Sequence, residues 1–202
     1  MFMALKDQME FPSENKKVLL HTCCAPCSSA IIEYLMANGI EPVIYYCNPN
    51  IHPYEEYLIR KEECTRYAEA LGLEIVDADY DHKQWLEAVR GLENEPERGG
   101  RCMECFRLRL LMTARYAQGR GIDVITTTLA SSRWKSLEQI DAAGQWACEM
   151  ASAENDGLLP VLWWGRNWRK GGLQERRNQI IKEYGFYNQL WCGCEFSRKN
   201  VD

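Results

Sequence analysis

The fold of this 202-residue chain is decided by the stretch Val18-Leu19-Leu20-His21-Thr22-Cys23-Cys24-Ala25-Pro26-Cys27. The apolar run at its start, from Val18 to His21, predicts a buried strand. A helical pattern follows from about Pro26 to Asn38 and is ended by Gly39. A strand that leads directly into a helix is the first half of a βαβ unit.

The same alternation of strand and helix repeats along the rest of the chain. We expect further strands at 42–47, 73–76, 123–127 and 158–163, and further helices at about 53–71, 81–90, 101–118, 135–153 and 173–184. Strands that alternate with helices in this way indicate a parallel sheet. The sequence therefore predicts an α/β fold with an open, mainly parallel sheet of about five strands and flanking helices.

The remaining composition is that of a soluble globular protein. Residues 1–17 are mostly polar and are expected to be a flexible segment, followed by a single α/β domain at 18–202. No stretch has the continuous apolar character of a signal peptide or the roughly 20 apolar residues of a membrane helix, so we expect a cytoplasmic protein without a membrane partner. The net charge of −5 argues against a general nucleic-acid binder but is compatible with a local basic patch.

Seven of the ten cysteines lie in three tight groups, and this is the strongest chemical signal in the chain. The groups are Cys23-Cys24-Ala25-Pro26-Cys27, Cys102-Met103-Glu104-Cys105 and Cys192-Gly193-Cys194. Because nothing indicates secretion, a disulfide framework is the weaker explanation. Clustered thiolates are soft metal ligands and favour an iron–sulfur cluster, although structural zinc would accept the same set. The domain at 18–202 is therefore interpreted as a metalloenzyme domain.

These groups are expected to meet at one edge of the sheet. Ligands of open parallel sheets bind beyond the carboxyl ends of the strands, and Cys23 and Cys24 directly follow the first predicted strand. Cys102 and Cys105 lie at the start of a helix that can reach the same edge. A helix N-terminus stabilises negative charge, so we expect lowered thiol pKa values at these positions.

Cys192-Gly193-Cys194 has a different spacing and supports a different hypothesis. A disulfide across one intervening residue closes a small strained ring, and glycine relieves part of the backbone cost. The favoured interpretation is a dithiol that delivers two electrons, with ligation of a second metal ion and a structural role as the alternatives. The three isolated cysteines, Cys47, Cys64 and Cys148, are interpreted as small core residues.

Motifs from Val18 to Ser197 together resemble the QueH-type epoxyqueuosine reductases. The residues that carry this resemblance are His21 to Cys27, Tyr45 to Pro53, Glu56-Tyr57, Arg101 to Phe106, Arg109-Leu110, Thr113-Ala114, Thr126 to Leu129, Lys135 and Trp191 to Ser197. The resemblance implies a fold similar to the HUP/PP-loop adenine-nucleotide hydrolase-like sheets. It also implies the reduction of epoxyqueuosine to queuosine at the wobble position of tRNA, with electrons from an unidentified donor.

The resemblance also implies the cofactors and their ligands. Cys23, Cys24, Cys102 and Cys105 would hold a 4Fe–4S cluster, and Cys192 and Cys194 would be the redox-active pair. Cys27 is a candidate ligand of a second metal, such as an additional mononuclear iron. Epoxide reduction also needs a proton donor, for which His21, His52 and Tyr57 are the nearest candidates along the sequence.

The sequence is also compatible with two other functions, and it contains one candidate RNA-binding segment. The rival enzyme is an adenylylsulfate-type sulfonucleotide reductase, and the rival from another class is a zinc-bearing RNA-binding module. Six basic residues lie close to tryptophans that could stack on bases, namely Arg166, Arg169, Lys170, Arg176, Arg177 and Lys182 beside Trp163, Trp164 and Trp168. Such a run is also compatible with a solvated helix face and tryptophans in the core.

Overall fold

The computed structural model describes residues 10–155 and 157–200 and is organised around a five-stranded sheet. The strand order is β3-β2-β1-β4-β5, and every pair of neighbouring strands is parallel. The strands are β1 (Lys17–Thr22), β2 (Glu41–Tyr46), β3 (Ile75–Asp77), β4 (Val124–Thr127) and β5 (Leu162–Trp163). The predicted α/β fold with an open parallel sheet is confirmed.

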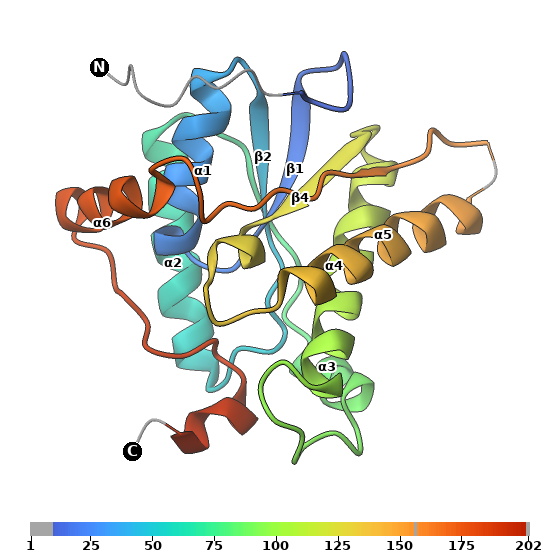
Figure 1. Ribbon diagram of the computed structural model, residues 1–202, viewed down its shortest axis with the longest axis vertical. Helices are drawn as coiled ribbons and strands as arrows, with labels where there is room; N and C mark the ends of the chain where they lie inside the picture. The colour runs from blue at the N-terminus through green and yellow to red at the C-terminus, as the bar shows by residue number, and fades with distance from the viewer. Residues whose placement is uncertain (1–9, 156, 201–202) are drawn as a thin grey trace.

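Helices cover both faces of the sheet, as Figure 1 shows. They are α1 (Ala25–Ala37), α2 (Tyr54–Ala70), α3 (His82–Ala88), α4 (Gly100–Gly119), α5 (Leu137–Glu154) and α6 (Leu173–Tyr184), with short 3-10 helices η1 (Thr128–Ser131) and η2 (Glu195–Asn200). Helices α1, α2 and α6 lie on one side of the sheet, and α4 and α5 on the other. None of the helices in the described part of the chain has the length and apolar character needed to cross a membrane.

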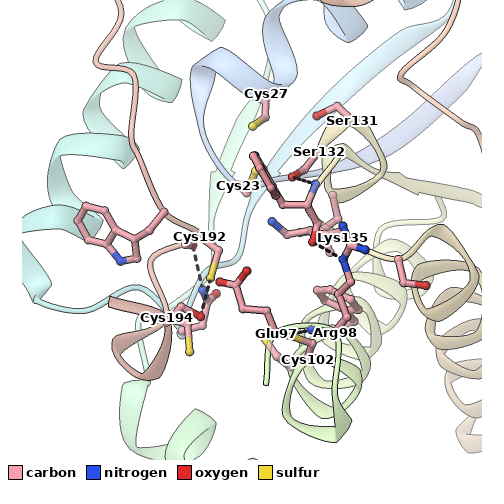
Figure 2. A pocket seen from close by; sticks show the side chains of 18 of the residues that line it. Cys23, Cys27, Glu97, Arg98, Cys102, Ser131, Ser132, Lys135, Cys192 and Cys194 are labelled. Carbon is pink, nitrogen blue, oxygen red and sulfur yellow. Dashed lines mark hydrogen bonds between the residues drawn. The ribbon is translucent and has the colours of Figure 1, made fainter. Parts of the chain in front are cut away.

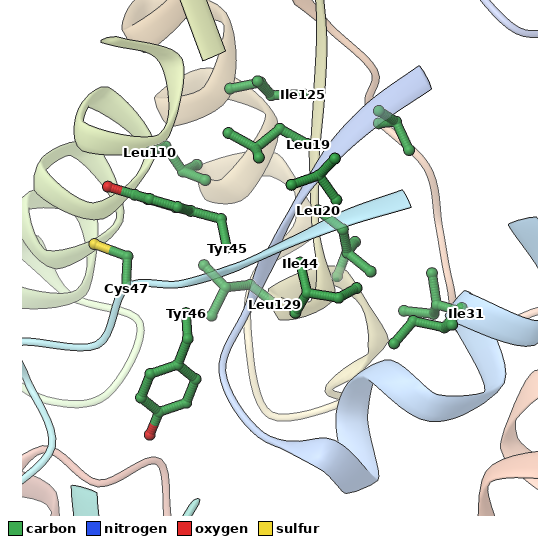
Figure 3. Close-up of a cluster of buried hydrophobic side chains, with 14 of the residues drawn as sticks. Leu19, Leu20, Ile31, Ile44, Tyr45, Tyr46, Cys47, Leu110, Ile125 and Leu129 are labelled. Atoms are coloured by element: carbon green, nitrogen blue, oxygen red, sulfur yellow. The ribbon is translucent and has the colours of Figure 1, made fainter. Parts of the chain in front are cut away.

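The core lies on both sides of β1, the central strand. Leu19 and Leu20 are fully buried although their side chains leave opposite faces of the strand. Figure 3 shows Leu19 on the side of Leu110 of α4, and Leu20 on the side of Ile31 of α1. A strand that is buried on both faces reads as a continuous apolar run, which is why the sequence marked this strand clearly.

Two strands begin two or more residues later than predicted, each for a local reason. The fifth strand begins only at Leu162, because Pro160 supplies no backbone N–H for the ladder, and Leu158 and Leu159 are 53% and 74% exposed. The third strand begins at Ile75 instead of Leu73, whose backbone N–H donates to the Ala68 carbonyl at the end of α2 (2.9 Å).

Phe11 and Ser13, in the N-terminal segment at 1–17, contact the α/β domain. The Phe11 ring packs edge-to-face on Trp164, with 5.0 Å between centroids. The Ser13 hydroxyl donates to Asp123 Oδ2 at 2.5 Å. Residues 1–9 of the predicted flexible segment lie outside the described residues.

A buried arginine ties α4 to the carboxyl ends of β1 and β2. Arg109 is 3% exposed and donates from Nε to the Cys47 carbonyl (3.2 Å) and from Nη2 to Asn48 Oδ1 (2.5 Å). The Asn48 side chain in turn donates from Nδ2 to the Thr22 carbonyl (2.9 Å). One guanidinium therefore joins the helix to the loop after β2 and, through Asn48, to the end of β1.

We predict that Arg109→Lys destabilises the protein, because an ammonium cannot match the forked geometry of these bonds. The expected loss in the free energy of unfolding is about 2–4 kcal/mol, the usual cost of leaving buried polar groups unpaired. The matched control on the same helix is Arg107→Lys, where a half-exposed ion pair with Glu104 should be worth less than about 1 kcal/mol. Denaturant unfolding of the two variants measures the difference, and equal midpoints would contradict it.

Candidate metal and redox site

Three cysteine groups converge on one cavity of about 350 Å³ at the carboxyl edge of the sheet. The cavity is lined by six thiols, those of Cys23, Cys27, Cys102, Cys105, Cys192 and Cys194. Figure 2 labels Cys23 from the loop after β1, Cys27 from the start of α1, Cys102 from the start of α4, and Cys192 and Cys194 from the C-terminal segment, all around the same space. The segments lie far apart in the sequence, and the parallel topology brings them together.

Cys23, Cys24 and Cys27 form the tightest of the three groups. Their Sγ atoms all lie within 4.8 Å of one another, and the Cys23 and Cys24 sulfurs are 3.8 Å apart. Cys24 is 1% exposed, and its sulfur accepts a hydrogen bond from Gln189 Nε2 (2.6 Å). This arrangement can hold a metal ion, and it includes Cys27, which the sequence prediction had set apart from Cys23 and Cys24.

The three thiols of this group differ in pKa. Hydrogen bonds from Cys24 and Cys27 lower the pKa of Cys23 well below its ordinary value, with further help from the charge of Lys135. Burial raises the pKa of Cys24. Hydrogen bonding to Cys23 raises the pKa of Cys27 to about 11. Cys23 is therefore the thiol that ionises first, and a soft cation would replace the protons that the other two retain.

Cys102 and Cys105 lie one turn apart in the first two turns of α4. The Cys102 sulfur accepts a hydrogen bond from the backbone N–H of Arg98 (3.3 Å). Nη1 of Arg109 lies 3.9 Å from the Cys105 sulfur. Burial nevertheless raises the pKa of Cys102, so the expectation that a helix start lowers the thiol pKa is wrong here. Desolvation outweighs the helix dipole at this position.

Cys192 and Cys194 are held in place by the glycine between them. Gly193 has a φ of 97°, and a Cβ at this position would lie 2.7 Å from Cγ1 of Ile51. The Gly193 carbonyl accepts from the backbone N–H of His52 (2.9 Å), and Cys194 forms an antiparallel bridge with Ile51. Both cysteines are free thiols, and hydrogen bonding from Cys194 lowers the pKa of Cys192 well below its ordinary value.

The cavity wall is strongly cationic although the chain as a whole carries a net charge of −5. Seven basic residues and one carboxylate line it: Arg60, Arg98, Arg101, Arg109, Arg133, Lys135, Arg177 and Glu97. Burial acts to lower the pKa of Lys135, but negative charge on Cys192, Cys23 and Cys27 outweighs it and raises the pKa. Lys135 therefore stays charged and offsets the thiolates around it.

None of the three proton donors suggested by the sequence lines this cavity. His21 is fully buried, and its Nε2 donates to the Cys47 carbonyl (3.1 Å) while Nδ1 lies 2.7 Å from Thr127 Oγ1. Burial lowers the pKa of His21 to about 3. His52 is exposed and stacks on His82 (5.1 Å), and the Tyr57 hydroxyl donates to Asp77 Oδ1 (2.7 Å). These three side chains thus have structural partners elsewhere.

Basic side chains of the run near the C-terminus form ion pairs and hydrogen bonds with other parts of the chain. Arg176 pairs with Glu33 (2.7 Å) and Glu183 (2.7 Å), and Arg169 donates to backbone carbonyls. Trp164 and Trp168 are 7% and 1% exposed, so the hypothesis that these rings stack on bases is wrong. Arg177 is the member of the run that lines the cavity.

The core assignments of the isolated cysteines are confirmed. Cys47, Cys64 and Cys148 are each at most 5% exposed. The Cys47 sulfur lies 3.7 Å from Met112 Sδ. None of the three lines the cavity described above. The cations Arg109 and Lys135 were the groups that sequence reasoning did not assign, although both lay within the motifs that carried the family resemblance.

Comparison with known proteins identifies a single family. Residues 18–200 match the family model described as "Epoxyqueuosine reductase QueH". The chain is 44% identical to the epoxyqueuosine reductase QueH of Histophilus somni over 98% of its length and 79% of the relative's. It is 44% identical to that of Haemophilus influenzae, over 97% of this chain and 77% of the relative. Identity to that of Thermotoga maritima is 32%, over 89% of each chain.

The family model covers all three cysteine groups and nearly the whole described fold. These matches favour the enzyme over the zinc-bearing RNA-binding module, and epoxyqueuosine reduction over sulfonucleotide reduction. The chain belongs to the QueH family of epoxyqueuosine reductases.

Proposed function

We propose that this protein reduces epoxyqueuosine to queuosine at the wobble position of the tRNA anticodon, within the α/β domain at 18–202. The observation that carries the proposal is the cavity that gathers six thiols in a chain of this family. Its cationic wall suits a polyanionic RNA substrate. A tRNA-modifying activity of this kind belongs in the cytoplasm, with reducing equivalents from an external donor.

The residues of the cavity fit the proposed 4Fe–4S cluster. Cys23, Cys24, Cys102 and Cys105 are its proposed ligands; Cys24 does not line the cavity, but its sulfur lies 3.8 Å from that of Cys23, which does. Thiolates are the ligands that such clusters require, and the buried cations Arg109 and Lys135 offset their charge. When bound, the cluster supplies one-electron transfer to the substrate. Cys27, within 4.8 Å of Cys23 and Cys24 by sulfur, is the proposed ligand of a second, mononuclear iron.

The Cys192–Cys194 pair can balance the reaction. Deoxygenation of an epoxide to an alkene breaks two C–O bonds, consumes two electrons and two protons, and releases water. Oxidation of two thiols to a disulfide releases two electrons and two protons. An external reductant would then return the disulfide to two thiols. The lowered pKa of Cys192 makes it the thiol of this pair that ionises first.

Lys135 is placed to assist at the substrate oxygen. The ammonium Nζ belongs to a side chain that lines the cavity together with Cys192 and Cys23. A fixed cation in a partly desolvated cavity stabilises negative charge that develops on the oxygen of an opening epoxide. We assign no role in the reaction to His21, His52 and Tyr57, which bond or stack with other residues outside the cavity lining.

The direct test is turnover of tRNA that carries epoxyqueuosine, under anaerobic conditions with a chemical reductant and iron-loaded protein. Mass spectrometry of the released nucleoside should show loss of one oxygen atom. Loaded protein that leaves epoxyqueuosine unchanged, yet releases sulfite from adenylylsulfate, would overturn the proposal in favour of the rival reductase.

Cys102→Ser is expected to abolish cluster loading, because a hydroxyl is a poor replacement for a thiolate ligand. Iron and acid-labile sulfide per chain, measured after anaerobic reconstitution, should fall to background. The matched control is Cys148→Ser, which removes a buried thiol outside the cavity and should leave the iron content unchanged. Full iron and sulfide in Cys102→Ser would remove this residue from the ligand set.

Cys192→Ser is expected to keep the cluster and to lose turnover. With serine at this position the two thiols that would supply the electrons on oxidation to a disulfide are no longer both present, whereas the four proposed ligands are unchanged. Iron content and product formation are measured on the same preparation. A Cys192→Ser enzyme that loads iron and turns over as the wild type does would exclude the dithiol from the reaction.

A further inference from the structure

A tryptophan is displayed at the wall of the cavity. Trp134 lines the cavity and is 78% exposed, whereas Trp164 and Trp168 are 7% and 1% exposed. Removing an indole ring from water lowers the free energy of the system. A ring this exposed beside a substrate cavity is therefore available for contact with a binding partner.

The backbone that carries this ring is firmly held. Arg98 donates from Nε to the Trp134 carbonyl (3.0 Å) and from Nη2 to the Arg133 carbonyl (3.0 Å). Nη2 of Arg169 donates to the carbonyls of Ser132 (2.5 Å) and Lys135 (2.7 Å). Two guanidinium groups therefore fix four consecutive peptide carbonyls. A preorganised loop loses little entropy when its exposed side chain binds a partner.

The surroundings of the ring select the chemistry of that partner. Arg133 precedes Trp134 and is itself exposed, and both line a cavity with seven basic residues and one carboxylate. The next residue, Lys135, lines the same cavity. An aromatic ring beside cationic side chains suits a partner that carries both flat rings and phosphates. Single-stranded nucleic acid has this composition, and its bases stack on such platforms.

We propose that Trp134 is a stacking platform for an unpaired base of the anticodon loop next to the nucleoside that enters the cavity. This inference rests on the proposed function and deepens it by assigning a positioning residue for the RNA. The ring would hold the neighbouring base outside the cavity while the modified nucleoside reaches the thiols. Arg133 would contact the phosphate backbone beside it.

The test uses iron-loaded protein and an anticodon stem-loop RNA that contains epoxyqueuosine. Trp134→Ala should weaken binding, measured by fluorescence anisotropy, by roughly 5- to 150-fold, the range for loss of one base–aromatic stack. KM should rise by a similar factor, while kcat stays within about two-fold because the reacting groups are untouched. Trp134→Phe should restore most of the affinity. The control Leu159→Ala, which removes another exposed apolar side chain outside the cavity lining, should bind as the wild type does.

Two further measurements separate stacking from a general structural effect. An abasic substitution next to the modified nucleoside should cost little additional affinity in Trp134→Ala, although it weakens binding to the wild type. The salt dependence of binding should be unchanged in Trp134→Ala, whereas Arg133→Ala should lower its log–log slope by about one.

Different results would contradict the proposed function and the stacking inference. Wild-type protein that binds the RNA without reducing it would contradict the proposed function alone. Wild-type protein that reduces epoxyqueuosine, with equal RNA affinity and equal KM in Trp134→Ala, would overturn the stacking inference alone. Additive losses for Trp134→Ala and the abasic RNA would also overturn it, and would leave the ring available to a protein partner instead.

Discussion

The site depends on compensation between clustered thiols and buried cations. Six thiols line one cavity. Without opposing charge, each thiolate would disfavour the ionisation of the remaining thiols by repulsion between like charges. Arg109 and Lys135 supply that charge, and the thiolates in turn raise the pKa of both cations despite burial. Arg109 also bonds the loop after β2, so charge balance and the position of α4 depend on one side chain. The fold and the chemistry of the cavity are therefore coupled through the same guanidinium.

Much of this arrangement could be predicted from the sequence, because its cause is local. The buried run before Cys23 marked the central strand, and the rule that ligands bind beyond the carboxyl ends of parallel strands located Cys23 and Cys24 at that edge of the sheet. Cys47, Cys64 and Cys148 were placed in the core because a small thiol among apolar neighbours seldom has another role. The family resemblance rested on these same motifs, and the family model confirms it.

The remaining features are tertiary, and no local pattern carries them. The tryptophans beside the basic run looked like a base-stacking surface, but Trp164 and Trp168 are covered by packing that only the folded chain reveals. Burial likewise reversed the expected effect of the helix start on Cys102. The start of β5 was predicted too early because leucines at 158 and 159 suggested a core strand, whereas Pro160 has no backbone N–H to continue the ladder. Trp134 lies in a loop without periodicity, so only the folded chain shows that its ring is exposed while its carbonyl is bonded by Arg98.

The contrast between an acidic chain and a basic cavity has a consequence for how a partner approaches. The chain as a whole carries a net charge of −5, while seven basic residues and one carboxylate line the cavity, so the cavity wall is where a polyanion is attracted. A field of this shape steers an incoming RNA, so that productive orientations are favoured before any contact forms. Discrimination therefore begins during diffusion, several ångströms before a base reaches a side chain.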